Sequence, residues 1–428
     1  MQFKKCREVF PNTLFVVLLW GLAGLFFQES CATSSRRQAK QFSSERQQAI
    51  QDSLQKAREF EIQKYLSFGR ENWKNKMFTD ALPHLWKVVD LDTEKKYPMA
   101  FQYLGECYLK LAKPDSAEFV YRQAIEKYPA NSYFHRMLGW LLNSLRKYEQ
   151  AVFEYREAIR LDSVARADDY RALGILLVQL DRRQEALPVY EKLVELEPDD
   201  IEALIVLANL YMFVGEEEAS LTVQERALVL DPQNTKLLYS LGEAYYKRHE
   251  FEKAIAKFKQ LLTITPEDIL ALEILGYAFQ NAGDPKNAIA AYEKVLSLKP
   301  DHKKVLCEMA TSLKELKQYR AARSTVRKAL KMDPHYGYAN IVLGEIYESA
   351  ANNCLERRED KTIRFDDKLV FELAFQQFQK AAGDPAFAGM AKTKLDYVKN
   401  DIPTRGDRHM HPDQKYPRLD CYKWIVED

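Results

Sequence analysis

Residues 98–129 read PMAFQYLGECYLKLAKPDSAEFVYRQAIEKYP, and this stretch decides the fold. Its closing proline, Pro129, has counterparts that recur later in the chain at a strict interval of 34 residues. Because a proline commonly follows the end of a helix, each of these prolines marks the end of one repeating unit. A period of this length predicts a helical solenoid. The regularly spaced prolines are Pro198, Pro232, Pro266, Pro300 and Pro334.

Small residues recur at two internal positions of the unit. The first position lies 24 residues before the proline, and the second lies twelve residues after the first. We expect small side chains there to let the two helices of a pair approach closely. The first set is Gly105, Gly174, Ala208, Gly242, Gly276 and Ala310, with Gly139 and Gly344 in the same register in units that lack the proline. The second set is Ala117, Ala151, Ala186, Ser220, Ala254, Ala288 and Ala322.

The pattern of these units resembles the tetratricopeptide repeat family. The unit quoted above carries Phe101, Leu104-Gly105, Tyr108, Ala117, Tyr121, Ala124 and Pro129 at the family's positions. The resemblance implies an all-α, right-handed superhelical solenoid of helix-turn-helix units. About nine units fit between residues 62 and 382. Asn72 and Thr93 replace the expected Tyr and Pro in the first unit, as befits a terminal repeat.

The units divide the chain into four parts. We expect a signal peptide or membrane anchor at residues 1–32, a polar helical linker at 33–61, the solenoid at 62–382, and a capping helix with a C-terminal tail at 383–428. The second helix of the ninth unit appears about eighteen residues late, at Ala374, Phe378 and Ala381. That delay predicts an insertion at about 350–368.

The N-terminus indicates export. Positive residues precede an uncharged apolar run, Leu14 to Phe27, which is short for a membrane span and typical of a secretory signal. Three outcomes stay open: cleavage before Thr33, lipidation of Cys31 as in bacterial lipoproteins, and an uncleaved anchor. The alternative to export is a short apolar N-terminus that stays in the cytoplasm.

Ligand recognition is expected on the concave face, which the first helix of each unit forms. Exposed aromatic side chains with mixed charge on a rigid scaffold favour an extended peptide or a helix as ligand. The alternative is that some aromatic residues pack sideways between repeats. The expected groove residues are Tyr133, Arg136, Trp140, Asn143, Asn209, Met212, Tyr239, Glu243, Tyr246, Glu273, Tyr277 and Gln280.

Composition and motifs argue against other classes of function. The chain has 63 basic and 62 acidic residues, interspersed, so no basic surface favours nucleic acid. No phosphate-binding loop, nucleophile elbow or metalloprotease motif is present, so we expect no enzyme and no cofactor. In the C-terminal tail, His409 and His411 lack the second pair of ligands that a metal site requires. A Cys/His enzyme in the tail is the least favoured alternative.

Two cysteines in the irregular regions suggest a cross-link. Cys354 opens the insertion and Cys421 lies near the end of the chain. If the tail folds back over the ninth unit, we expect these two residues to form a disulfide in an oxidising compartment.

Together these features predict a scaffold of the bacterial cell envelope that binds a peptide or helix of a partner protein in its groove. A membrane contact through the N-terminus is expected where that segment stays attached or lipidated. The runner-up is a cytoplasmic adaptor with the same groove. The residues leave the partner's identity and the oligomeric state open.

Overall fold

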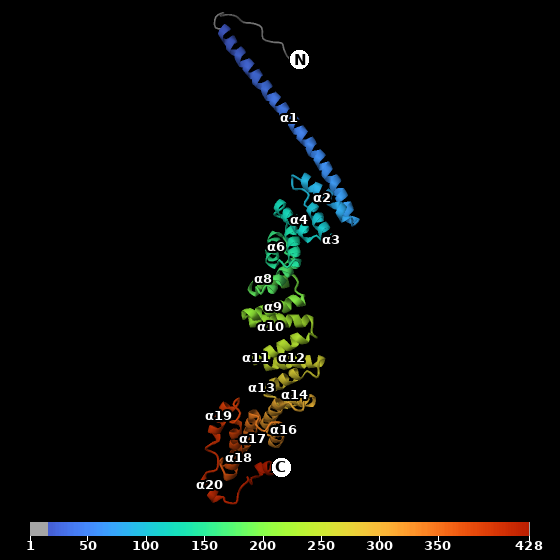
Figure 1. Cartoon of the computed structure of the whole chain (residues 1–428). Helices are drawn as coiled ribbons and strands as arrows, with labels where there is room; N and C mark the ends of the chain where they lie inside the picture. Colours follow the sequence, from blue (N-terminus) through green and yellow to red (C-terminus); the bar gives the residue numbers. More distant parts are fainter. Residues whose placement is uncertain (1–15, 428) are drawn as a thin grey trace. The chain divides into compact units, whose positions relative to one another are not determined.

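A computed structural model describes the backbone of residues 16–427 and the side chains of residues 42–427. Within that part of the chain all regular structure is helical, which confirms the all-α class (Figure 1). The chain forms two compact units, Met1–Arg182 and Arg183–Asp428, and each is described by itself.

The first unit is a run of helices in which each helix packs against the next one in sequence. This order is that of consecutive helical hairpins, and the expected groove residues of this unit all lie on α5, the first helix of its hairpin. The helices are α1 (Val16–Lys74), α2 (Phe78–Leu91), α3 (Met99–Lys110), α4 (Pro114–Lys127), α5 (Ser132–Ser144), α6 (Tyr148–Leu161) and α7 (Ala167–Gln179).

The second unit continues the same order and adds the C-terminal elements. Its first ten helices belong to the expected repeats. They are α8 (Arg183–Leu196), α9 (Ile201–Val214), α10 (Glu217–Leu230), α11 (Thr235–Lys247), α12 (Phe251–Ile264), α13 (Ile269–Asn281), α14 (Pro285–Leu298), α15 (Lys303–Glu315), α16 (Tyr319–Met332) and α17 (Gly337–Glu356). The chain then forms α18 (Phe365–Ala381), α19 (Ala388–Val398), α20 (Arg405–Met410), the 3₁₀ turn η1 (Asp420–Tyr422) and α21 (Lys423–Val426).

The helix α1 runs without a break through the boundary expected at residues 61 and 62. Its last turns pack against α2 and α3 as the first helix of the first hairpin. From Phe42 to Arg58 every side chain is exposed, including the apolar Ile50 and Leu54. The linker and the first repeat are therefore one continuous helix.

The structure does not bear on the expected N-terminal processing. The side chains of the apolar run and of Cys31, and with them the cleavage, lipidation and anchor alternatives, lie outside the described residues. A search of the described helices found none that is both long and apolar enough to cross a membrane.

Small residues bring the two helices of a hairpin into contact, as the sequence predicts. A methyl group added at Gly242 of α11 would lie 2.8 Å from the ring of Phe258 on α12. A methyl group at Gly276 would likewise overlap the ring of Tyr292. The two aromatic side chains are completely buried, so the missing Cβ atoms provide the space that these rings fill.

The repeated prolines lie just beyond helix ends, and a second signal follows them. Pro232 and Pro266 come two residues after α10 and α12. Two residues later, Asn234 and Asp268 cap the next helices, because their side-chain oxygens accept hydrogen bonds from the backbone N–H groups of Leu237 and Ala271. Each repeat boundary therefore ends one helix and starts another.

A residue with positive φ lies in the turn between the two helices of each hairpin from α1 to α6 and from α9 to α16, and in the turn that follows α7. Only Gly215 and Gly283 among these turn residues are glycines, and the periodic pattern of small residues gave no sign of the others. Left-handed backbone is unfavourable for residues with a Cβ atom, so these turns are held by the helices on either side. The other residues are Lys76, Ala112, Arg146, Asp181, His249 and Lys317.

The irregularity of the ninth hairpin has two components. The helix α17 contains 20 residues, whereas α15 contains 13, and a loop at 357–364 then leads to α18. The helix α19 follows and packs mainly against α18, with Ala391 and Val398 buried. The region expected as an insertion thus lengthens a helix before it forms a loop.

Candidate protein-interaction surfaces

In the first unit, Trp140 is the most accessible of the expected groove residues. It lies on α5 with 49% of its surface exposed. Tyr133 lies in the first turn of the same helix and is half-buried, with the centre of its ring 5.6 Å from that of Phe134. Burial raises the pKa of its hydroxyl group. Asn143 is also half-buried. The indole of Trp140 is therefore the main aromatic surface that α5 offers to a ligand.

The guanidinium of Arg136 is occupied by carboxylates of the protein itself. Its Nε and Nη2 atoms donate to both oxygens of Asp169 on α7, at 2.6 and 2.7 Å, and it also pairs with Asp162. These bonds raise the pKa of Arg136 above its ordinary value. Since Asp169 is only 2% exposed, this pair fixes α5 against α7. Arg136 stabilises the groove wall.

In the second unit, the expected groove residues differ in how far they are committed to the protein. Asn209 and Met212 on α9 are exposed. On α11, Tyr239 packs with its ring 5.8 Å from that of Phe258, and the hydroxyl of Tyr246 accepts a hydrogen bond of 3.1 Å from Asn281. These tyrosines are half-buried and preorganised. The remaining residue of α11, Glu243, pairs with Lys247 at 2.9 Å.

Polar side chains of α13 and α15 form a continuous hydrogen-bonded surface. The Tyr277 hydroxyl donates to Glu273, which also accepts from Lys304 at 3.5 Å and lies 3.3 Å from His302. The ammonium group of Lys304 lies 4.6 Å from the centre of the Tyr277 ring. Tyr277 and Glu273 thus act together, and burial together with this carboxylate raises the pKa of the phenol.

Gln280 connects this surface to a carboxylate that sequence reasoning missed. Its side-chain oxygen accepts hydrogen bonds from Ser312 at 3.0 Å and Tyr292 at 3.2 Å. Glu308 on α15 accepts from Tyr338 of α17 at 2.9 Å, and lies 3.5 Å from the amide nitrogen of Gln280. Burial raises the pKa of Glu308 despite these two donors. No cation bonds to this carboxylate among the contacts of the described residues.

At the end of this surface a polar cavity of about 360 Å³ lies between α15, α17 and α19. Lys314 and Lys394 bind Glu345 at 2.8 and 2.9 Å, and Lys394 lies 3.6 Å from Glu348. Burial would raise the pKa of Glu345, but the two lysines lower it overall, whereas burial raises the pKa of Glu348. The site was missed because Lys394 comes from α19, beyond the regular repeats.

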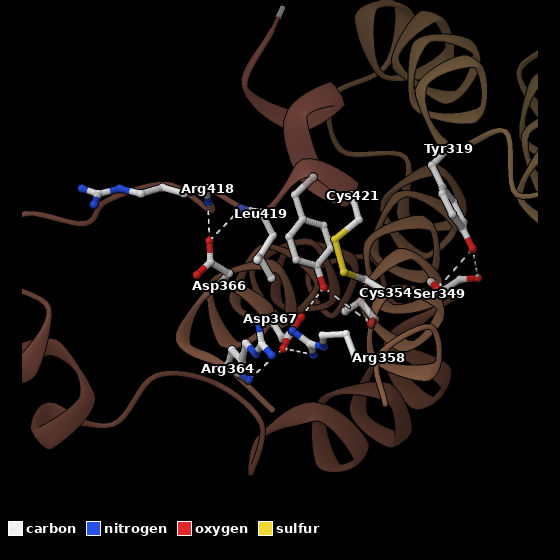
Figure 2. The surroundings of a disulfide bond; sticks show 12 residues. Tyr319, Ser349, Cys354, Arg358, Arg364, Asp366, Asp367, Arg418, Leu419 and Cys421 are labelled. Carbon is white, nitrogen blue, oxygen red and sulfur yellow. Dashed lines mark hydrogen bonds and ion pairs between the residues drawn. A yellow bond between two sulfur atoms is a disulfide. The ribbon is translucent and has the colours of Figure 1, made fainter. Parts of the chain in front are cut away.

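The C-terminal tail folds back onto the ninth hairpin and is cross-linked to it (Figure 2). Cys421 forms a disulfide bond with Cys354 near the end of α17, the pair expected from the sequence. The next residue, Tyr422, is completely buried, and its hydroxyl donates to Asp367 of α18. Arg358 pairs with the same carboxylate. The lengthened helix and the tail therefore pack together.

A buried arginine and two tyrosines hold the last turn of the chain. The rings of Tyr319 and Tyr347 each stack nearly parallel to the indole of Trp424, with ring centres 6.0 Å apart in both pairs. Arg323, only 1% exposed, donates to the carbonyl oxygens of Trp424 and Ile425 at 2.6 and 2.9 Å. Burial and the neighbouring Arg327 lower its pKa.

Two other polar residues of the C-terminal tail have structural partners. The ring of His411 stacks on Phe365 with the ring centres 4.4 Å apart, and Asp407 binds Lys368 at 2.8 Å. A search of the described residues found no group of His, Cys, Asp and Glu side chains that could hold a metal ion. Cys307 is a buried free thiol, whose pKa burial raises to about 12.

Comparison with known proteins identifies the repeats. Three family models, each described as tetratricopeptide repeat, match residues 39–209, 235–268 and 281–335. Tetratricopeptide repeats are thereby confirmed in both units, and the first match begins inside the segment expected as a linker. Among curated proteins, anaphase-promoting complex subunit 3 of Schizosaccharomyces pombe is 24% identical over 147 residues. That match covers 34% of this chain and 22% of the relative.

Solved structures include partial likenesses of the same kind. MamA is 21% identical, with a TM-score of 0.33, over 40% of this chain and 94% of that one. YrrB, described as a TPR protein with an unusual peptide-binding site, is 22% identical, with a TM-score of 0.35, over 44% of this chain and 95% of that one.

Proposed function

We propose that this chain of tetratricopeptide repeats is a protein-interaction scaffold of the bacterial cell envelope. It binds a peptide or helix of a partner protein along the first helices of its hairpins. Recognition is non-covalent, and the surface is formed before the ligand arrives. A preformed surface lowers the conformational entropy that binding must overcome.

The exposure of Trp140 is the observation that carries the binding role. Trp140 is 49% exposed, and it lies on α5, which the ion pair of Arg136 with Asp169 fixes against α7. Large aromatic side chains in such positions contribute much of the binding energy of protein interfaces. In the second unit, Tyr246 and Tyr277 present half-buried rings whose hydroxyl groups are already oriented by hydrogen bonds. Both surfaces suit an extended partner segment.

The envelope location is supported by two independent features. The Cys354–Cys421 disulfide is of a kind that persists in oxidising compartments and is rare in the cytosol. The apolar run Leu14 to Phe27 follows positive residues, as in export signals. Membrane attachment through Cys31 or through an uncleaved anchor would place the repeats at a membrane surface.

Crosslinking and pull-down from native membranes test the binding role, with Trp140→Ala and Tyr246→Ala compared with the unaltered chain. Phe153→Ala is the matched control, because Phe153 is 61% exposed on α6, a second helix. We expect the two groove variants to recover at least tenfold less of the partner and the control to recover it normally. Equal recovery by all four proteins would reject the groove as the binding surface.

Fractionation followed by N-terminal sequencing tests the location separately. A mature start at Thr33 or a blocked Cys31 would support export, whereas an intact N-terminus in the cytosol would favour the alternative of a cytoplasmic adaptor. The groove test and the location test can fail independently.

A further inference from the structure

A second cavity, of about 550 Å³, lies beside the disulfide bond. Residues from the start of α16, the end of α17 and the tail line it, and the side chain of Cys421 forms part of its wall. Its volume falls within the range of sites that hold small molecules, about 300–1,000 Å³. No residue of α13 or α15 lines this cavity.

The lining of this cavity is positively charged. Lys317, Arg320 and Arg357 line it, and no carboxylate does. Of the nearby acids, Glu427 pairs with Arg320, and Asp420 binds Lys423 at 2.8 Å. Neither Lys317 nor Arg357 has an ion pair among the contacts of the described residues. A concave surface with unmatched cations raises the local concentration of anions.

The two cysteines of the disulfide differ in accessibility. Cys421 is half-buried and faces the cavity, whereas Cys354 is only 5% exposed and belongs to the core of the ninth hairpin. A thiolate must reach one sulfur atom of a disulfide in order to exchange with it. A reagent in this cavity therefore meets Cys421 first.

We propose that this cavity binds small anionic thiols and that Cys421 is their site of S-thiolation. The thiolate sulfur of the ligand attacks Sγ of Cys421 and forms a new S–S bond. The bond between Cys421 and Cys354 breaks, and its electron pair leaves with Sγ of Cys354, which takes a proton from water. No other oxidant or reductant is needed, because the thiolate supplies the electron pair of the new S–S bond and the pair of the old bond leaves with Cys354.

The surroundings favour an anionic reagent for two reasons. The attacking group is itself a thiolate, and the cations around the cavity stabilise it against its neutral thiol. A reagent with a further carboxylate, such as a tripeptide thiol, gains a second ion pair at Lys317 or Arg357. The same cations repel a positively charged thiol.

The exchange is reversible, because contacts of the tail keep the two cysteines close together. Tyr422 is buried against Asp367, and Trp424 stacks on Tyr319 and Tyr347, so the tail is held by contacts that do not involve the sulfur atoms. These contacts keep the Cys354 thiol beside the mixed disulfide. Attack by Cys354 then expels the ligand and restores the original bond.

Exchange rates of the oxidised full chain with three thiols test this proposal. The reagents are reduced glutathione, which is anionic, 2-mercaptoethanol, which is neutral, and cysteamine, which is cationic. Each rate is divided by the rate of the same thiol with hydroxyethyl disulfide at the same pH, which removes differences in intrinsic reactivity. Acid quenching and peptide mass spectrometry locate the adduct.

At low salt we expect the normalised rate for glutathione to exceed that for cysteamine about tenfold, with the adduct on Cys421. In 1 M salt the two rates should approach each other, because the charges are then screened. The double variant Lys317→Gln with Arg357→Gln should slow only glutathione, by about threefold to tenfold. Lys294→Gln on α14, outside this cavity, is the control.

Equal normalised rates for glutathione and cysteamine at low salt would overturn the proposal, as would an adduct on Cys354. The salt dependence of the unaltered chain needs no variant, so the test does not depend on the folding of the substituted proteins. Far-ultraviolet circular dichroism confirms the helical content of the double variant.

Discussion

The hydroxyl group of Tyr422 donates a hydrogen bond to the carboxylate of Asp367, and neither side chain is accessible to solvent. The two residues are 55 positions apart in the sequence. Through this contact the end of the chain completes the interior of the ninth hairpin. Burial and the neighbouring carboxylate raise the pKa of the Tyr422 phenol, which keeps it a neutral donor.

Tyr422→Phe should loosen the tail without unfolding the repeats. The substitution removes one donor from a buried carboxylate, and such a loss costs about 1–3 kcal/mol. Hydrogen exchange followed by mass spectrometry should show faster exchange at residues 418–427 and at the start of α18. Tyr416→Phe is the control, because Tyr416 is 66% exposed in the same tail. Equal protection in both variants would contradict the prediction.

The disulfide should contribute to the stability of the C-terminal region. It joins residues separated by 67 positions, and the chain-entropy estimate for a loop of that length is about 4 kcal/mol. In urea unfolding followed by tryptophan fluorescence, a reductant should lower the midpoint of the unaltered chain. The double variant Cys354→Ser with Cys421→Ser should unfold at the lower urea midpoint both with and without reductant. A reductant that leaves the unaltered chain unchanged would show that the cross-link adds nothing.

Two glycines should respond to alanine in opposite directions. Gly283 has φ of 79° in the turn between α13 and α14, and nothing lies within 4 Å of a Cβ atom added there. Gly283→Ala should therefore destabilise the second unit by about 1 kcal/mol through backbone strain alone. Gly389 in α19 has equally open surroundings and no positive φ, so Gly389→Ala should stabilise by up to about 1 kcal/mol. Urea midpoints of the two variants measure the difference in sign.

Glu308→Gln should make the second unit more stable at neutral pH. Burial raises the pKa of Glu308, so the native state binds its proton more tightly than the unfolded chain does. The stability of the unaltered protein should rise as pH falls from the raised pKa toward the ordinary value of 4.5, and the variant should lose this rise. Unfolding measured between pH 4 and pH 8 tests this.

Glu345→Gln is the contrasting variant for the same titration. Although burial opposes it, Lys314 and Lys394 lower the pKa of Glu345 overall. Its ionised form therefore contributes stability that is present above the ordinary carboxyl pKa and is lost as pH falls through the lowered value. The variant should be less stable at pH 7. If Glu308→Gln and Glu345→Gln changed the free energy of unfolding at neutral pH in the same direction, the prediction that the two carboxylates differ would be wrong.

The repeats could be predicted from the sequence because their signals are local and recur many times. The proline interval fixed the helix ends, and the small residues fixed where helices approach, as at Gly242 against Phe258. The positive-φ turns could not be predicted from the sequence, because residue types such as His249 and Lys317 do not indicate a left-handed backbone. Their conformation is imposed by the helices that they join.

The surfaces were harder to predict than the fold. Position in the repeat predicts which side chains face the groove, but it does not predict which of them bind other residues of the protein. Arg136 is bound by Asp169 from the next hairpin, and Glu308 lies between partners from α13 and α17. Such contacts depend on pairs of residues in different repeats, which a single repeat pattern does not specify.

The uninterrupted helix α1 determines a distance. At a rise of 1.5 Å per residue, its 59 residues correspond to a rod about 90 Å long. The exposed stretch from Phe42 to Arg58 alone accounts for about 25 Å of that length. A helical rod transmits position far better than a flexible tether of equal residue number. Whatever holds the beginning of α1 therefore also sets the distance between that point and the first hairpin.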